Sequence, residues 1–318
     1  LLVQVPALMR LGLMPRPKWG WRHSGVRRII KLMIPTLFGS SVAQVNLLFD
    51  SVIATFLVTG SVSWLYYSDR LLEFPLGVLG IALATVILPN LSKKHAEAST
   101  AEFSATLDWA LRLALIITVP AAVGLVVLAG PILITLFQYD AFQPDDVRMA
   151  TYSLVAYSAG LPAFIAVKVL APGYYARQDT KTPVKIAIAA MVTNMGLNLL
   201  FVGLLLYQEF EGPHAGLALA SSVAAYLTAS LLVFGLRKRQ VSTPGRGWIR
   251  LWVSVGLSCT VMGALLYFMT LDIESWFEAS AILRVRNLAL TIVLGVIVYV
   301  FTCVVTGIKT HDLLRGAK

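Results

Sequence analysis

Three charged residues lie close together in an otherwise apolar stretch of the chain. Residues 63–80 read SWLYYSDRLLEFPLGVLG, and the charges are Asp69, Arg70 and Glu73. On a helix, spacings of three and four residues would project all three heads onto one broad face. A guanidinium suits phosphate oxygens, and the two carboxylates could orient it. One interpretation is a hydrated cavity in which Arg70 binds an anion, and the other is a self-neutralising trio that pins two helices together.

A second anomaly is Asp50, which lies in VNLLFDSVIATF with no basic neighbour at helical spacing. Oxygen ligands that could join it in a cation site are Asn194, Asn198 and Ser221, and the two asparagines lie four residues apart. A lone acid inside a membrane helix favours a functional role. The alternatives are a protonated, inert carboxyl packed against hydroxyl groups, and amides that only hold neighbouring helices together.

Positioning these side chains requires membrane helices. Of the 318 residues, 58% are hydrophobic and 13% are charged, whereas soluble domains carry about 25% charged residues. Uncharged runs near the ~20 residues that cross a bilayer recur along the chain. The fold class is therefore all-α, a polytopic integral membrane protein with about eight transmembrane helices. The expected spans are 27–57, 62–91, 103–128, 145–170, 183–207, 214–236, 248–270 and 283–306.

The basic residues indicate the orientation of these spans. Lys and Arg gather in alternate connections, which is typical of loops on the cytoplasmic side, so both termini are expected there. Because the basic residues are dispersed over these loops, topology explains the net charge of +10 better than a nucleic-acid partner does. Cys259 and Cys303 fall in the middle of spans and are expected to be unpaired.

The connections offer little for catalysis. The sequence shows no nucleophile elbow, no phosphate-cradling glycine loop and no zinc motif, so we expect no enzyme activity. Asp145 and Asp146 are typical of a helix start, where carboxylates face the positive end of the dipole. Lys168 lies near the end of its span and can extend toward the membrane surface, while a role in a cavity stays open.

The beginning of the chain reads as the end of an apolar helix followed by a basic, proline-rich linker. We therefore expect the sequence to be part of a longer protein. The expected division is 1–26, the end of a preceding helix and its linker; 27–238, a six-helix transport lobe; and 239–318, two additional helices and a short tail.

Three separated segments resemble one known family. They are TGSVSWLYYSDRLLEFPLGVLGIALATVILPNLS at 59–92, GPILITLFQYDAF at 130–142 and KVLAPGYYARQDTKTPVKIA at 168–187. All three closely resemble the MurJ (MviN) family of lipid II flippases. The resemblance implies a MATE-like exporter fold, with this chain as the last eight of fourteen helices. It also implies alternating access, aided by helix bending at Pro75 and Gly80.

The same resemblance implies a substrate and a location. The substrate would be lipid II, an undecaprenyl-pyrophosphate carrying a disaccharide-pentapeptide, moved across the bacterial inner membrane. Partners would be this lipid, membrane lipids and possible cell-wall synthesis machinery. The family's cavity charges map onto Asp69, Arg70 and Glu73, and the last two helices would form an apolar groove for the polyprenyl tail.

A sodium site of some family members is the only cofactor that the resemblance implies. It maps onto five positions: Asp50, Asn194, Asn198, the backbone carbonyl near Leu217, and Ser221. The family often has Asp where this chain has Asn198, which leaves Asp50 as the one carboxylate of the set.

Other functions remain open from the sequence. A related exporter of drugs or of another polyprenyl-linked saccharide would share the fold. A polyprenyl-linked glycosyltransferase or polymerase would need long acidic exported loops, and connections as short as 58–61 and 208–213 argue against it. A scaffold role without transport is the third alternative.

Overall fold

The computed structural model describes residues 5–10, 12, 23–97, 99–239, 241, 245 and 247–307. Every regular element in these ranges is a helix, which confirms the all-α prediction. The helices are α1 (Val5–Arg10), α2 (Ser24–Thr55), α3 (Ser61–Ala96), α4 (Thr100–Val127), α5 (Ala129–Phe137), α6 (Pro144–Tyr175), α7 (Lys181–Tyr207), α8 (Ala215–Lys238), α9 (Trp248–Met269), α10 (Ile273–Glu278) and α11 (Ala281–Val305).

Long apolar helices make this a multi-pass membrane protein. Within the described ranges, seven helices are long and apolar enough to cross a bilayer: α3, α4, α6, α7, α8, α9 and α11. They match seven of the expected spans. The remaining expected span, 27–57, corresponds to α2, which has 32 residues but is not among the seven. Its assignment as a span therefore stays a prediction.

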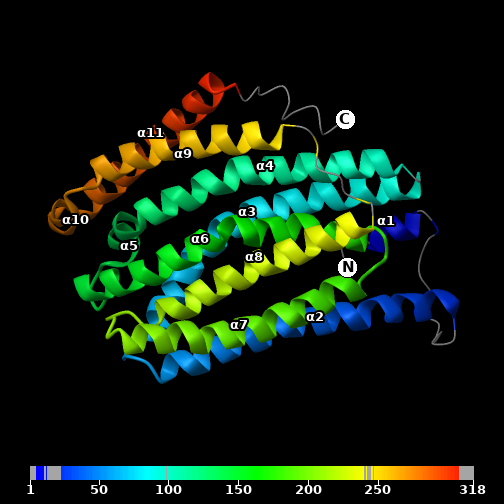
Figure 1. The fold of residues 1–318 in the computed structure, drawn as a ribbon, viewed down its shortest axis with the longest axis horizontal. Coiled ribbons are helices and arrows are strands. Elements are labelled where there is room, and N and C mark those ends of the chain that lie inside the picture. The colour runs from blue at the N-terminus through cyan, green and yellow to red at the C-terminus, as the bar shows by residue number, and fades with distance from the viewer. Residues whose placement is uncertain are drawn as a thin grey trace.

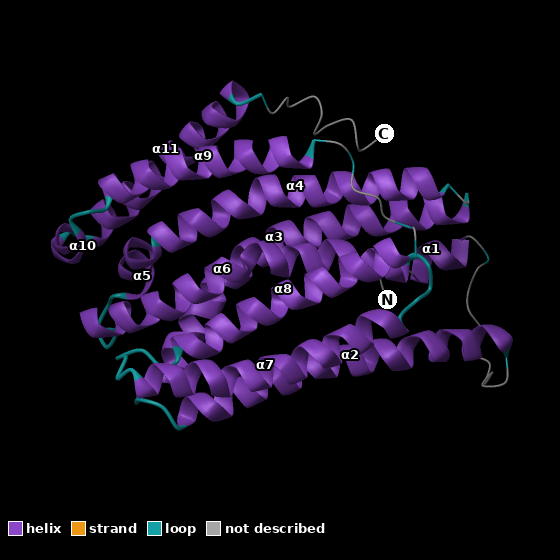
Figure 2. Cartoon of the chain, in the orientation of Figure 1, coloured by secondary structure: helices purple, strands orange, loops and turns teal. Residues whose placement is uncertain are grey.

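The long helices pack side by side, with α6 at the centre of the bundle (Figures 1 and 2). α6 contacts α3, α4 and α8 extensively, and α7 packs between α8 and α2. On the opposite flank, α9 and α11 pair with each other and α9 lies against α4. The order from one flank to the other is thus α2, α7, α8, α6 with α3, α4, and the α9–α11 pair (Figure 1).

One end of the bundle carries the short helices α5 and α10 and is called the α10 end; α1 lies at the other, the α1 end (Figure 1). At the α10 end, the guanidinium of buried Arg284 donates to the backbone carbonyls of Trp276, Phe277 and Gln138, at 2.9, 2.8 and 3.2 Å. These carbonyls belong to or follow short helices, where the last C=O groups lack intrahelical partners. Arg284 of α11 therefore fixes α10 and the end of α5 to one another.

The first turn of α6 also lies at the α10 end, and it confirms the expected helix start at Asp145 and Asp146. The Asp146 carboxylate accepts a hydrogen bond from the Gln143 backbone N–H at 2.8 Å, as half of a capping box. Its other oxygen accepts from the indole N–H of Trp64 on α3, also at 2.8 Å. The cap thus joins α6 to α3 as well.

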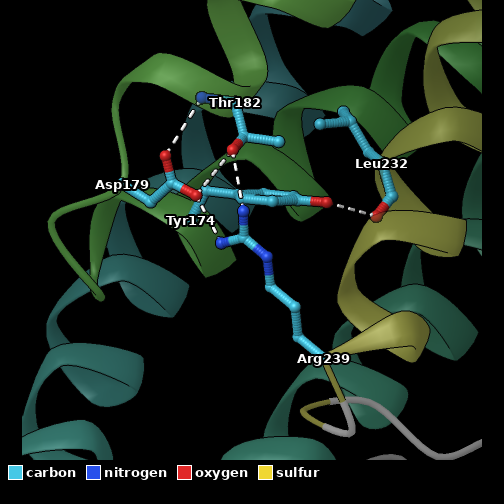
Figure 3. A network of polar contacts seen from close by, with 5 residues as sticks. All are labelled: Tyr174, Asp179, Thr182, Leu232 and Arg239. Atoms are coloured by element: carbon cyan, nitrogen blue, oxygen red, sulfur yellow. Dashed lines mark hydrogen bonds and ion pairs between the residues drawn. The ribbon is translucent and has the colours of Figure 1, made fainter.

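At the α1 end, a polar network ties the α6–α7 turn to α8 (Figure 3). Asp179 accepts hydrogen bonds from the Thr182 backbone N–H and hydroxyl, at 3.0 and 2.7 Å, and pairs with Arg239. The Tyr174 hydroxyl donates to the Leu232 carbonyl at 2.7 Å. Burial raises the pKa of Asp179, but the hydrogen bonds from Thr182 and Arg239 outweigh it, and the pKa lies below its usual value.

Candidate functional site

A cavity of about 530 Å³ lies among α2, α3, α6, α7 and α8. Its lining includes Asp50 from α2 and Asp69 from α3. These residues belong to the two sequence clusters that were predicted separately. The fold brings one carboxylate from each cluster to the same cavity.

Asp50 lies in a hydrogen-bonded amide and hydroxyl network. The Asn198 amide donates to Asp50 Oδ1 at 2.5 Å and to Asn194 Oδ1 at 3.1 Å. The Asn194 amide in turn donates to Ser221 Oγ at 3.3 Å. The Ser221 hydroxyl lies 3.5 Å from Asp50 Oδ2, a long contact at the limit of a hydrogen bond. Four residues predicted for the site, from α2, α7 and α8, therefore meet in space.

The donor set of this network fits a hard monovalent cation. It presents carboxylate, amide and hydroxyl oxygens, which hard cations prefer. Asn198 is completely buried, and its Oδ1 has no hydrogen-bond partner. A fully satisfied inert carboxyl, the alternative reading of Asp50, does not explain this orphaned acceptor, because buried polar atoms are normally paired.

Two observations limit the cation site. Leu217, the expected backbone ligand, is fully buried one turn before Ser221 but is not among the residues that line the cavity. In the part of the chain that the structure describes, no group of three or more His, Cys, Asp or Glu could hold a metal ion. The arrangement therefore suits a weakly held ion bound through amides and one carboxylate.

Only one member of the predicted trio lines this cavity. Asp69 lines the cavity, but Arg70 and Glu73 do not. Their side chains are 53% and 51% exposed, and Arg70 Nη1 lies 2.5 Å from Glu73 Oε2. The guanidinium also stacks over the Tyr66 ring, 4.9 Å from its centroid. Because successive helix residues are about 100° apart, Arg70 is turned away from the face of Asp69.

Packing of α3 against α6 explains this rotation. The Ser68 hydroxyl is completely buried and bonds to the Ala150 carbonyl and to the Ser153 hydroxyl of α6, both at 2.9 Å. Leu72, one turn later, is 3% exposed. The ion pair of Arg70 and Glu73 is internal to α3. It therefore does not pin two helices, as the structural alternative required.

Two cavity residues were missed by the sequence analysis as site residues. Tyr157 and Lys168, both on α6, line the cavity with Asp50 and Asp69. A position within a span was the only sequence signal for Lys168, and it did not distinguish a cavity from the membrane surface. Nothing in the sequence separated Tyr157 from the other aromatic residues of the helix.

A second cavity of about 600 Å³ lies among α4, α6, α8 and α9. Its lining is mainly aliphatic, and its polar members include Asp108, Arg237 and Trp248. Asp108 of α4 accepts a hydrogen bond from the indole N–H of Trp248 on α9 at 2.7 Å, and it pairs with Arg112. Of the two last long helices, only α9 contributes to the lining of this cavity.

Comparisons with known proteins place this geometry in a family. The family model described as "Lipid II flippase MurJ" matches residues 1–286. A probable lipid II flippase MurJ of Haemophilus influenzae is 49% identical over 98% of this chain, and that of Vibrio cholerae is 47% identical over 98%. The chain covers 61% and 58% of these proteins, so it spans about three fifths of the relatives that it matches.

The solved structures agree with the sequence comparison. A structure of lipid II flippase MurJ in an inward closed conformation is 26% identical, with a TM-score of 0.69 over 92% of this chain and 57% of that chain. An outward-facing MATE family multidrug transporter has a TM-score of 0.56 at 17% identity, covering 95% of this chain and 70% of that chain, a likeness of fold alone. The fold is therefore MATE-like, and the chain belongs to the MurJ lipid II flippase family.

Proposed function

We propose that this chain forms part of a lipid II flippase, which carries the lipid-linked peptidoglycan precursor from the cytoplasmic to the periplasmic leaflet. Membership of the MurJ family is the observation that carries this proposal. The cavity supports it, since two carboxylates and a lysine line a space inside an apolar helix bundle. Charged groups at this depth are costly unless they face water or a polar ligand.

The two cavities suggest how an amphipathic substrate is divided. The polar headgroup cannot cross hydrocarbon, so it follows a polar path that includes the cavity between α2, α3, α6, α7 and α8 and the exposed Arg70 on the neighbouring surface of α3. The polyprenyl tail lies in apolar surroundings, and the cavity among α4, α6, α8 and α9 offers such a surface. Transport moves the headgroup and forms or breaks no covalent bond, so the proposed protein is a transporter and not an enzyme.

Arg70 is the proposed contact for the pyrophosphate. Its guanidinium is exposed, contacts one carboxylate oxygen of Glu73 through Nη1, and lies over the Tyr66 ring. Phosphate oxygens can replace the Glu73 carboxylate because both accept two parallel N–H bonds. Asp69 faces the neighbouring cavity, so its proposed role shifts from orienting Arg70 to lining the path of the headgroup.

Sodium is the proposed ion at Asp50. Asp50, Asn194, Asn198 and Ser221 would hold it, and the ion would supply one positive charge beside a buried carboxylate. Neutralising Asp50 in this way allows the network to rearrange without leaving a charge unpaired.

Location and organisation are part of the same proposal. The protein would lie in the bacterial inner membrane, with the α1 end and both termini of the chain cytoplasmic. The chain would be the last eight of fourteen helices, with α2–α8 as the transport lobe and α9–α11 as an addition. Support comes from the relatives' greater length and from the packing of α9 on the outer side of α4.

The proposal is tested with the full-length protein in liposomes. Fluorescent lipid II in the inner leaflet should become accessible to an external quencher, faster in sodium than in potassium. The Arg70→Ala variant should leave the lipid where it is. Lipid II that stays in its leaflet with the wild-type protein, under either ion, would contradict the proposed function.

A further inference from the structure

The charges of the polar cavity lie at different levels along the bundle. α3 and α6 run side by side in the same direction, with Ser68 opposite Ser153. Asp69 follows Ser68, whereas the stem of Lys168 crosses α3 at Gly80. Eleven residues separate Asp69 from Gly80, which is about 16 Å along a helix. The carboxylate of Asp69 is thus well removed from the level of Lys168, which is nearer the α1 end.

Lys168 lies too far along the bundle to pair with Asp69. Among the described residues that line the cavity, it is the one with a positive charge. The rise of about 16 Å along α3 between Asp69 and Gly80 exceeds both the ~4 Å of an ion pair and the ~8 Å screening length at physiological salt. Within the described ranges, none of the ion pairs found includes Lys168. The α1 end of the cavity therefore presents an available cation.

Gly80 gives the lysine stem its path. A Cβ atom at this position would lie 2.5 Å from Lys168 Cδ and 3.3 Å from Cε, so any larger residue would push the stem aside. Gly77, one turn earlier on α3, has nothing within 4 Å of the same built atom. The aliphatic stem of Lys168 therefore packs against α3, and Lys168 lines the cavity. This placement differs from that of a lysine whose stem extends along lipid toward the membrane surface.

We propose that Lys168 binds a phosphate group of the lipid-linked pyrophosphate at the α1 end of the cavity. The inference rests on the proposed function and adds a second phosphate contact to that function, distinct from Arg70 in helix and in face. An ammonium is a compact charge that binds phosphate without a fixed orientation. Such a contact suits a headgroup that moves, while the fork of Arg70 suits one that is held.

The test measures binding by the full-length protein in nanodiscs, with undecaprenyl pyrophosphate and the uncharged undecaprenol as probes. Lys168→Gln should weaken binding of the pyrophosphate about tenfold or more, because it removes a charge-assisted hydrogen bond. It should leave undecaprenol binding unchanged. Lys168→Arg should retain affinity within about threefold. Unchanged pyrophosphate affinity in Lys168→Gln would overturn the inference and favour a lysine that only reaches the membrane surface.

A matched pair of glycine variants tests the position of the lysine without removing it. Gly80→Ala should displace the stem and weaken pyrophosphate binding several-fold, whereas Gly77→Ala should not change it. Equal affinities in the two variants would contradict the placement. If Lys168→Gln loses pyrophosphate affinity while the wild-type protein fails to move lipid II, the phosphate site stands and the proposed function fails.

Discussion

The Asp50 network and the Arg70–Glu73 pair differ in how they are held. Asp50 is 7% exposed and is bonded by residues of two other helices. Arg70 and Glu73 are about half exposed and bond to each other on one helix. A network shared by three helices is formed by the fold itself. A pair within one turn can open without moving the backbone, which is what exchange of Glu73 for a substrate phosphate requires.

The largest expected effect separates the two regions by function. Arg70→Ala should abolish transport, a loss of at least about a hundredfold, because it removes the guanidinium that would bind the phosphate oxygens. The temperature of thermal unfolding should stay near the wild-type value, since an exposed ion pair contributes little to stability. Growth of a flippase-depleted strain and the liposome assay measure the first effect, and calorimetry the second.

A matched control for this variant lies on the same helix. Lys93 is 72% exposed on its side chain and only approaches Glu97, at 4.0 Å. Lys93→Ala should therefore transport normally. If it fails as completely as Arg70→Ala, loss of surface charge explains the defect and the specific role of Arg70 is wrong.

Variants of the buried Asp50 network should change both the ion dependence of transport and the stability of the protein. Asp50→Asn should remove the sodium stimulation of transport and lower the sodium-supported rate about tenfold. Asp50→Ala should also lower the free energy of unfolding by about 1–3 kcal/mol, because the buried Asn198 amide loses one of its two acceptors. Asp69→Asn changes the other carboxylate of the same cavity and should keep the sodium dependence. Sodium dependence retained in Asp50→Asn would remove the cation site.

The Asp179–Arg239 network is intermediate, since it joins two helices at the surface (Figure 3). Asp179→Asn should lower the free energy of unfolding by about 1 kcal/mol, because it weakens the hydrogen bonds from Thr182 and removes the ion pair with Arg239. Because the pKa of Asp179 is lowered in the folded state, its contribution is complete above the unfolded value of about 3.9 and is lost as the pH falls through the folded value. Unfolding of both forms at pH 7 and at pH 3 measures this. A difference that grows toward pH 3 would contradict it.

The smallest expected effect comes from breaking the exposed ion pair of Arg70 and Glu73. Glu73→Gln should free the guanidinium of Arg70 and change lipid II affinity only about two- to threefold, since exposed ion pairs contribute little. Equilibrium binding of lipid II in nanodiscs detects such a change. A loss as large as that of Arg70→Ala would show that Glu73 contacts the substrate itself.

Sequence reasoning predicted which residues belong to the site better than it predicted which way their side chains point. Residue types identified the members of the Asp50 network before any resemblance was considered, and the four-residue spacing correctly put Asn194 and Asn198 on one face. Spacing also relates Asp69 to Arg70 by angle, but it does not say which side of α3 is inward. The hydroxyl contact of Ser68 with α6 decides that, and it depends on how two distant segments pack.

The position of Lys168 along the bundle could not be predicted from the sequence, for the same reason. Its approach to Gly80 joins residues far apart in the chain, and neither residue carries a local signal of the contact. The long apolar helices, by contrast, follow from hydropathy along the chain, and seven of the eight expected spans match such helices in the described ranges.

Water in the polar cavity is the condition on which the proposed path of the headgroup depends. It can be measured by thiol labelling, after replacing the two buried free cysteines, Cys259 and Cys303, by alanine. A cysteine at Leu76, which lines the cavity, is compared with one at Phe301, which is exposed on the apolar surface of α11. A membrane-impermeant maleimide should label Leu76→Cys rapidly, more slowly with lipid II present, and leave Phe301→Cys unlabelled. Equal protection of both positions in every condition would contradict a hydrated path.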